Sequence, residues 1–192
     1  MNLAPRRVAR NPVATVILGI DPGSIVTGWG VVEAAGSSAV HVAHGVITSD
    51  GAVGPAARLG RIYRGIQEVF EAYRPAVVSL ERVFFARNAQ SALKLGQARG
   101  VALLAAAHHG ASVYEYAAAE IKAAVVGYGR ATKEQVQMMV CSLLGLRGTM
   151  AEDASDALAA AICHANRSAF HSRLPAAVGR PAPFSRRRNS PF

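Results

Sequence analysis

Apolar and polar positions follow two different periods along this chain. Residues 13–20 form a nearly unbroken apolar run closed by a Pro-Gly-Ser turn, which is typical of a central strand buried on both faces. We expect that strand to end at Asp21. Residues 28–33 and 39–48 are short β-branched runs on either side of the polar residues 36–38, and this pattern predicts an antiparallel meander. Three consecutive strands therefore open the domain.

The next segment changes to a helical period. Residues 55–73 place apolar side chains at steps of three and four, which predicts an amphipathic helix with Arg58, Arg61 and Arg64 on its opposite face. A fourth strand is expected at residues 76–80. The rest of the pattern predicts a long helix at 88–109, a short strand at 112–116, and helices at 118–126, 132–144 and 152–167. Together these elements predict an α/β fold with one mixed five-stranded sheet flanked by helices.

Composition supports a folded domain that does not cross a membrane. The chain has 192 residues, of which 51% are hydrophobic and 17% charged, so it is long enough to bury a core. The uncharged stretch 100–114 is shorter than the roughly 20 apolar residues that a membrane span needs. The arginine-bearing N-terminus precedes no apolar stretch, so no secretory signal is expected. Cys141 and Cys163 lie in apolar helical patterns, which suits core packing in a reduced cytoplasm.

The net charge of +9 is concentrated at the two ends of the chain. Residues 1–12 and 172–192 hold eight arginines and no acidic residue, whereas the rest carries 13 basic and 12 acidic residues. We expect disordered basic arms at 1–12 and 169–192, around a folded domain at 13–168. Such arms bind polyanions without sequence preference. Charge alone fits nucleic-acid binding and a solubilising tail equally well.

Four carboxylates fall at the edges of the expected sheet. Asp21 and Glu81 end two strands, while Asp153 and Asp156 share one face in the first turn of the last helix. Each has an ordinary explanation when taken alone. Asp21 could form the turn, Glu81 could pair with Arg82, and the two aspartates of the helix could interact with its dipole.

Taken together, the four carboxylates predict a different chemistry. A charge at the end of an apolar strand is costly to desolvate unless it is paired or binds a cation. Converging carboxylates repel one another unless cations neutralise them, and ligand sets made only of oxygen favour Mg²⁺ or Mn²⁺ over zinc. Two such ions about 4 Å apart activate a water molecule for phosphodiester hydrolysis. The pattern therefore predicts a nuclease site.

Several motifs also carry a family resemblance. They read ILGIDPGS at residues 17–24, TGWGV at 27–31, ERVFFARN at 81–88, SALKLGQARG at 91–100, VVG at 125–127 and DASDALA at 153–159. In order and spacing, these motifs resemble the RuvC-type Holliday-junction resolvases of the ribonuclease H-like superfamily. The resemblance covers residues 15–167, and the run at 91–100 is the most specific part. An Asp-x-Gly turn alone would also fit the phosphate loops of sugar kinases and related ATPases.

The resemblance implies a fold, a site and a substrate. The fold is ribonuclease H-like, and the metal-binding catalytic residues are Asp21, Glu81, Asp153 and Asp156. Two Mg²⁺ ions per site are implied, with Mn²⁺ as a substitute. Asp153 stands where some members have histidine, which keeps this site all-carboxylate. Glu152 points about 100° away on the helix and is interpreted as a helix N-terminal charge.

The implied substrate is a four-way DNA junction, cut during homologous recombination and DNA repair. A homodimer nicks two strands of like polarity and leaves 5′-phosphate and 3′-hydroxyl ends. A branch-migration helicase complex is the implied partner. Two rival hypotheses remain: an ATPase or kinase using the turn after Asp21 as a phosphate loop, for which a second domain is expected, and a non-catalytic junction-binding protein, in which the carboxylates would be dispensable.

The resemblance also implies DNA contacts around the carboxylates. Phe84 or Phe85 is expected to insert against a base, although both rings could instead pack inward. Lys122 and Lys133 match family lysines that face the scissile phosphate, although each alone is typical of a solvated surface lysine. Three further residues are expected to follow the DNA backbone: Arg87, Lys94 and Arg99.

Two other features have less specific interpretations. Gly96 and Gly100 lie four residues apart on the long helix, where they would allow a close approach either to a second subunit, as the resemblance implies, or to the protein's own sheet. Four histidines lack metal-ligand spacing and are assigned no role: His44, His108, His109 and His164.

Overall fold

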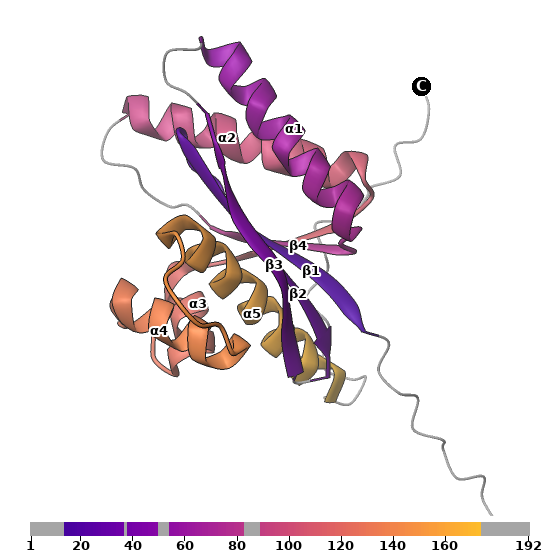
Figure 1. Cartoon of the computed structure of the whole chain (residues 1–192), viewed down its shortest axis with the longest axis vertical. Helices are drawn as coiled ribbons and strands as arrows, with labels where there is room; N and C mark the ends of the chain where they lie inside the picture. Colours follow the sequence, from indigo (N-terminus) through magenta and orange to yellow (C-terminus); the bar gives the residue numbers. More distant parts are fainter. Residues whose placement is uncertain (1–13, 37, 50–53, 83–88, 174–192) are drawn as a thin grey trace, which may run out of the picture.

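The structure is a computed structural model that describes residues 14–36, 38–49, 54–82 and 89–173. In these ranges it contains five strands and five helices (Figure 1). In chain order they are β1 (Thr15–Asp21), β2 (Val26–Ala35), β3 (Ser38–Thr48), α1 (Pro55–Tyr73), β4 (Val77–Glu81), α2 (Ala89–His108), β5 (Ser112–Tyr116), α3 (Ala118–Val126), α4 (Lys133–Leu144) and α5 (Glu152–Arg173).

All five strands form one sheet in the order β3-β2-β1-β4-β5. β2 is antiparallel to β1 and β3, whereas β4 is parallel to β1 and β5 is parallel to β4. β1, β3, β4 and β5 therefore all point the same way, and their carboxyl ends meet at one edge of the sheet. The mixed five-stranded sheet predicted from the hydrophobic pattern is confirmed.

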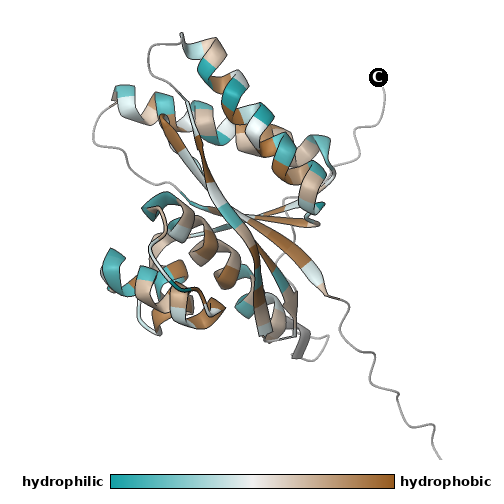
Figure 2. Ribbon diagram, in the orientation of Figure 1, coloured by the Kyte–Doolittle hydropathy of each residue, from teal (hydrophilic) through white to brown (hydrophobic). Residues whose placement is uncertain are grey.

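Helices cover both faces of this sheet, with α1 and α2 on one side and α3, α4 and α5 on the other (Figure 1). Successive residues of β1 supply the two cores, since strand side chains alternate between faces. Ile17 packs in the core under α5, and Leu18 packs in the core under α1 and α2. The apolar strands run between these layers in Figure 2. This burial on both faces explains the unbroken apolar run.

α5 packs directly on the backbone of β1 and β2. A Cβ atom at Gly19 would overlap the carbonyl oxygen of Ala157, and one at Gly28 would overlap the carbonyl oxygen of Asp153. In addition, the buried Ser79 hydroxyl of β4 donates a hydrogen bond of 2.6 Å to the Ala160 carbonyl. The absence of side chains at these two glycines therefore allows α5 to cross the sheet at close range.

The expected element boundaries agree with the structure to within two residues at most positions. One clear exception is the last helix, which was expected to end at residue 167 but continues to Arg173. Ala169 is only 6% exposed, so packing continues past the domain boundary expected at 168. Residues 1–12 and 174–192 lie outside the described residues, and the expectation for both arms stays a prediction.

Two further expectations concern the membrane and the cysteines. No helix in the described part of the chain is long and apolar enough to cross a membrane. Both cysteines are free; Cys163 is buried, whereas Cys141 is only half-buried. Core packing therefore holds fully for Cys163 and partly for Cys141.

Candidate active site

The acidic residues that end β1 and β4 lie at the same edge of the sheet. These two strands are parallel neighbours, and Ile20 of β1 pairs with Leu80 of β4. Asp21 and Glu81 are the next residues on their strands, so both side chains follow the same rung of the ladder. Both are half-buried. This register brings the two acids that were expected at strand ends to one edge of the sheet.

The first turn of α5 completes this acidic edge. Asp21 pairs with Gly28 across the β1–β2 ladder, and the backbone of Asp153 lies directly against Gly28. One turn further along α5, Asp156 projects from the same face as Asp153, and both are half-buried. Acidic groups from three distant parts of the chain are therefore gathered beside the end of β1.

Burial and neighbouring carboxylates raise the pKa values of three of these groups. For Asp21, burial together with repulsion from Asp156, Asp153 and Glu81 raises the pKa from 3.8 to about 7. The pKa of Glu81 is also raised, first by burial and then by Asp156. Burial is likewise the main cause of the raised pKa of Asp156. Such mutual repulsion is what a bound cation would relieve.

The donor set fits a hard divalent cation, because it consists entirely of carboxylate oxygens. Within the described residues, however, no three side chains of Asp, Glu, His or Cys are already arranged to hold a metal ion. Carboxylates that no cation neutralises repel one another, which favours side chains at this edge that point apart. The chemistry of the donors therefore fits the expected ion, while their oxygens would have to close around it.

Two lysines border the acidic edge. Lys122 Nζ donates a hydrogen bond of 2.7 Å to the Ala131 carbonyl, and its charge acts to lower the pKa of Glu81. Lys133 forms an ion pair with Glu152, and its Nζ lies 3.6 Å from Oδ2 of Asp156. The hydrogen bond to Glu152 raises the pKa of Lys133. Both lysines therefore lie beside the carboxylates instead of standing alone on the surface.

Glu152 has a role that the sequence analysis missed. It was interpreted as a helix N-terminal charge pointing away from the site, but it binds Lys133 and contributes to the raised pKa of Asp156. Its partner lies on α4, and no local pattern indicates this contact. The only available signal was the neighbouring match of Lys133 to the family lysines.

Arg99 is held by protein contacts. Its guanidinium forms an ion pair with Glu115 of β5 and donates a hydrogen bond of 2.9 Å to the Glu81 carbonyl. The side chain is only 17% exposed. This geometry gives Arg99 a structural role that ties α2 to the ends of β4 and β5, and its contact with DNA stays a prediction.

Of the other expected DNA contacts, the structure describes only Lys94. Lys94 is exposed on α2, as a backbone contact requires. Phe84, Phe85 and Arg87 lie outside the described residues, so their predicted contacts stay predictions.

Gly96 and Gly100 face open space on α2: among the described atoms, none lies within 4 Å of a Cβ built at either position. The alternative that they pack against the protein's own sheet is therefore wrong. Leu93 and Leu104 on the same helix are 69% and 50% exposed. Together these four residues leave an uncovered strip, which we call the α2 strip.

His164 takes part in the core. Its Nδ1 lies 2.7 Å from the Tyr116 hydroxyl, and its ring is 4.4 Å from that of Tyr114. Burial lowers the pKa of His164 to about 4, so the ring is neutral at pH 7. This contact joins α5 to β5.

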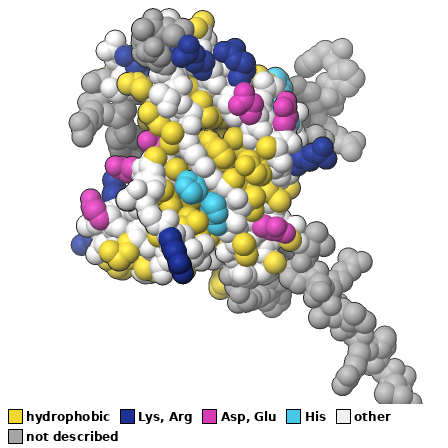
Figure 3. Space-filling model, viewed as in Figure 1, with side chains coloured by type: hydrophobic (Ala, Val, Ile, Leu, Met, Phe, Trp, Pro, Cys, Tyr) yellow, Lys and Arg dark blue, Asp and Glu magenta, His cyan; other side chains and the backbone are white. Residues whose placement is uncertain are grey.

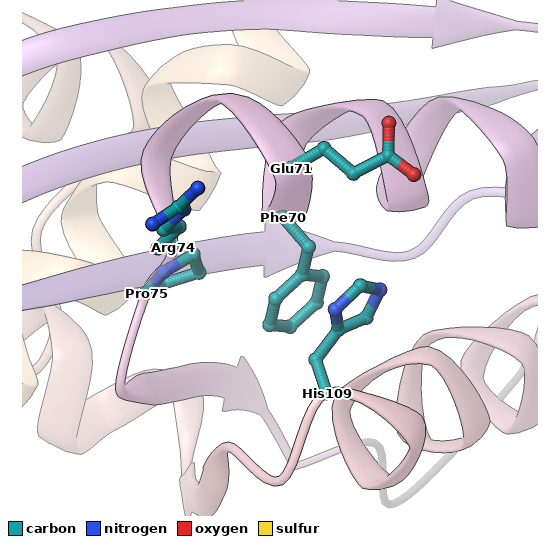
Figure 4. Close-up of a pocket in the computed structure, with 5 residues that line it drawn as sticks. All are labelled: Phe70, Glu71, Arg74, Pro75 and His109. Carbon is teal, nitrogen blue, oxygen red and sulfur yellow. The ribbon is translucent and has the colours of Figure 1, made fainter.

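A pocket of about 410 Å³ lies at the opposite edge of the sheet (Figure 4). Its lining includes Pro75, which precedes β4, and His109, which follows α2. The His109 ring stacks on Phe70 with 4.4 Å between centroids. Because the amino ends of the parallel strands lie here, the pocket is separate from the carboxylates.

A mixed sheet with acidic side chains at its carboxyl edge and a helix crossing close above them defines the ribonuclease H-like class of α/β domains. Comparison with known proteins gives the family within this class. The family model described as "Crossover junction endodeoxyribonuclease RuvC" matches residues 17–164. The chain belongs to the RuvC family.

Individual relatives agree with this assignment. The chain is 54% identical over 158 residues to a crossover junction endodeoxyribonuclease RuvC of Geotalea uraniireducens, covering 82% of this chain and 92% of the relative. A Pseudomonas fluorescens SBW25 protein of the same name is 53% identical over 165 residues, covering 86% and 93%. The chain therefore spans nearly the whole length of these relatives.

Solved structures are similar as well. Thermus thermophilus RuvC in complex with a Holliday junction substrate superimposes with a TM-score of 0.77 at 36% identity, covering 82% of this chain and 97% of that chain. The yeast mitochondrial Holliday junction resolvase matches with a TM-score of 0.55 at 13% identity, which shows a shared fold only.

Proposed function

We propose that this protein is a DNA endonuclease that resolves Holliday junctions by phosphodiester hydrolysis in homologous recombination and DNA repair. Support comes from membership of a family described as crossover junction endodeoxyribonucleases, and from a similar RuvC structure in complex with a Holliday junction substrate. The observation that carries the proposal is the acidic edge, where Asp21 and Glu81 end the paired strands β1 and β4 and Asp153 lies against Gly28, the ladder partner of Asp21.

The proposed site depends on divalent metal, with two Mg²⁺ ions that Mn²⁺ can replace. Asp21, Glu81, Asp153 and Asp156 are the residues that would hold them. When bound, such ions supply an activated water molecule and neutralise charge on the leaving oxygen. Asp21 and Asp156 are half-buried on β1 and α5, so the fold brings their backbones to one edge, and the side-chain oxygens would close around the ions.

The two lysines supply fixed positive charge beside these carboxylates. Lys133 is 63% exposed, so its ammonium is accessible to a phosphate group while it stays near Asp156. Lys122 is held by the Ala131 carbonyl. We assign both lysines to orientation of the scissile phosphate, since a positioned cation favours negative charge there.

A homodimer is the proposed working form, with the α2 strip as its contact. Glycines without covering atoms allow two helices to approach closely, and the exposed Leu93 and Leu104 would be buried by a second copy. An isologous contact generates a two-fold axis, which fits two like-polarity nicks in a nearly two-fold junction. A branch-migration helicase complex is the proposed partner.

A direct test uses a synthetic four-way junction and a linear duplex of the same sequence. With Mg²⁺ or Mn²⁺, we expect paired nicks in the junction and none in the duplex, and products that a DNA ligase can seal. Chelation by EDTA should stop the reaction. Equal cutting of the duplex, or cutting that survives chelation, would contradict the proposal.

A further inference from the structure

The charges on α1 are arranged against the dipole of the helix. Its amino half carries Arg58, Arg61 and Arg64, whereas Glu68 and Glu71 lie in its carboxyl half. The first turn has no acidic residue and the last turn has no basic one. Helix dipoles favour the opposite placement, with acids near the amino end and bases near the carboxyl end. A local preference that is broken in this way often marks a functional surface.

Among the described residues, no carboxylate forms an ion pair with the three arginines. The ion pairs found in the described part of the chain belong to Arg99, Lys133 and Arg167, and none includes an α1 arginine. Arg64 and Glu68 are spaced for an i, i+4 pair, but with the base first, which is the weaker order. The charges of the exposed Arg61 and Arg64 are therefore available to an external anion, while Arg58 is half-buried beside them.

The side chains gather toward the amino end of the helix. Arg58 Nη2 donates a hydrogen bond of 3.2 Å to the side chain of Gln97 on α2. Arg64 Nη1 reaches back to 3.6 Å from the position that a Cβ at Gly60 would take. Arg61 lies between them in sequence and is exposed. We call these three residues the α1 arginine row.

Topology places the amino end of α1 at the sheet edge that carries the carboxylates. β3 is parallel to β1, and the Ser49 hydroxyl after β3 donates a 3.0 Å hydrogen bond to the Ile25 carbonyl, in the turn that follows Asp21. α1 begins a few residues after Ser49 and runs back to Arg74 at the opposite edge. The amino end of α1 therefore starts at the edge that carries the carboxylates.

A second connection runs through α2. Arg58 contacts Gln97, and Arg99, two residues further along α2, donates to the Glu81 carbonyl. The row is thus linked to the end of β4 through a single helix. In Figure 3, basic side chains gather near the amino end of α1, whereas acidic side chains lie farther along that helix.

We propose that the α1 arginine row binds the phosphate backbone of a duplex arm of the junction beside the acidic edge. This inference rests on the proposed function and adds a contact surface outside the carboxylate site. Arg58 to Arg64 spans six residues, or about 9 Å of helix. Duplex DNA offers about two to three phosphates per strand over that length. Guanidinium groups bind phosphate oxygens in a bidentate manner without reading sequence.

The test compares substitutions at the two ends of the same helix. Arg61→Gln and a triple variant carrying R58Q, R61Q and R64Q neutralise the row. Arg74→Gln removes the exposed arginine that caps the carboxyl end of α1 at the opposite edge and is the matched control. The dissociation constant for a synthetic four-way junction is measured for each protein over a series of salt concentrations, with Ca²⁺ in place of Mg²⁺.

The logarithm of the association constant falls as log salt rises, and each phosphate contact contributes about 0.9 to the steepness of that line. We expect the line to become shallower by about 1 for Arg61→Gln and by about 2 to 3 for the triple variant. Arg74→Gln should keep the slope of the unmodified protein. An unchanged slope for both row variants, or an equal change for Arg74→Gln, would overturn the inference. Exposed Arg61 makes the single variant informative even if the triple variant fails to fold.

Cleavage by the unmodified protein separates the two proposals. If the unmodified protein nicks the junction with Mg²⁺ but the row variants keep its salt dependence of binding, only the proposed DNA contact of the α1 arginine row is wrong. If it does not nick the junction, the proposed function fails, whatever the slopes show.

Discussion

Gly28 of β2 lies so close to the carbonyl oxygen of Asp153 on α5 that even a methyl group at Gly28 would overlap it. Gly28 is also the ladder partner of Asp21. This contact therefore sets the distance between the strand that carries Asp21 and the helix that carries Asp153. Gly28 thus shapes the site without contributing a functional group to it.

Gly28→Ala should lower both stability and junction cleavage, because α5 must move away from β2. We expect a loss of about 1 to 3 kcal/mol in the free energy of unfolding, as for other overpacked sites, measured by urea denaturation. Gly60→Ala on α1 is the control, since its Cβ would meet only Arg64 at an ordinary distance; it should be stabilising by up to about 1 kcal/mol. A Gly28→Ala protein as stable and active as the parent would show that α5 is not held this way.

Asp21→Asn should stabilise the metal-free protein at alkaline pH. The pKa of Asp21 is 3.8 as an ordinary value and about 7 in the folded chain. Between these values the folded state holds a proton that the unfolded state releases, so stability falls as pH rises through this window. Above about pH 7 the cost is complete, and removing the charge should recover up to about 4 kcal/mol.

The measurement is urea denaturation in EDTA at pH 8 and below pH 4. Parent and variant should differ at pH 8 and agree at the lower pH. An Asp21→Asn protein that is less stable than the parent at pH 8 would show that repulsion does not dominate at this site.

Lys133→Gln should raise the pKa of Asp21 further, because Lys133 is the group that lowers it. The side-chain carboxyl signals in a metal-free NMR titration report this change directly. Lys94→Gln on α2 serves as the control and should leave the Asp21 titration unchanged. We also expect Lys133→Gln to slow junction cleavage by at least about tenfold, through loss of a positioned cation. An unchanged Asp21 titration would show that the charge of Lys133 does not act on this carboxylate.

Gly100→Leu should weaken self-association if the α2 strip forms the dimer contact. A leucine has open space around it in the single chain, so the monomer should fold normally, while a second helix could no longer approach closely. Sedimentation equilibrium compares its dimer dissociation constant with that of the parent. The control is Lys94→Gln, an exposed position about 120° around α2 from Gly100. Unchanged association for Gly100→Leu would place the dimer contact elsewhere.

Local signals predicted most of the fold. The helix at Pro55–Tyr73 begins with a proline at its first turn, and α3 ends at Gly127, which has a φ of 96°. Both boundaries can be read from the chain because proline and glycine act within a few residues. The extension of α5 to Arg173 depends instead on distant packing, which no local pattern reports.

The candidate site divides in the same way. Asp21 and Glu81 could be predicted as strand-end residues from the apolar runs before them, whereas their common edge follows from the parallel pairing of β1 and β4. The contacts of Arg99 with Glu115, and of Glu152 with Lys133, join elements that are distant or separated by a loop. These pairs depend on how the helices cross the sheet, so sequence spacing does not predict them.

The most direct test of the account asks whether the four carboxylates hold metal together. A crystal of the protein with uncleaved junction DNA is soaked in Mn²⁺, and the ions are located by their anomalous scattering. We expect manganese about 2.0 to 2.2 Å from carboxylate oxygens of Asp21, Glu81, Asp153 and Asp156. Manganese bound elsewhere, or no manganese at this edge with DNA present, would contradict it.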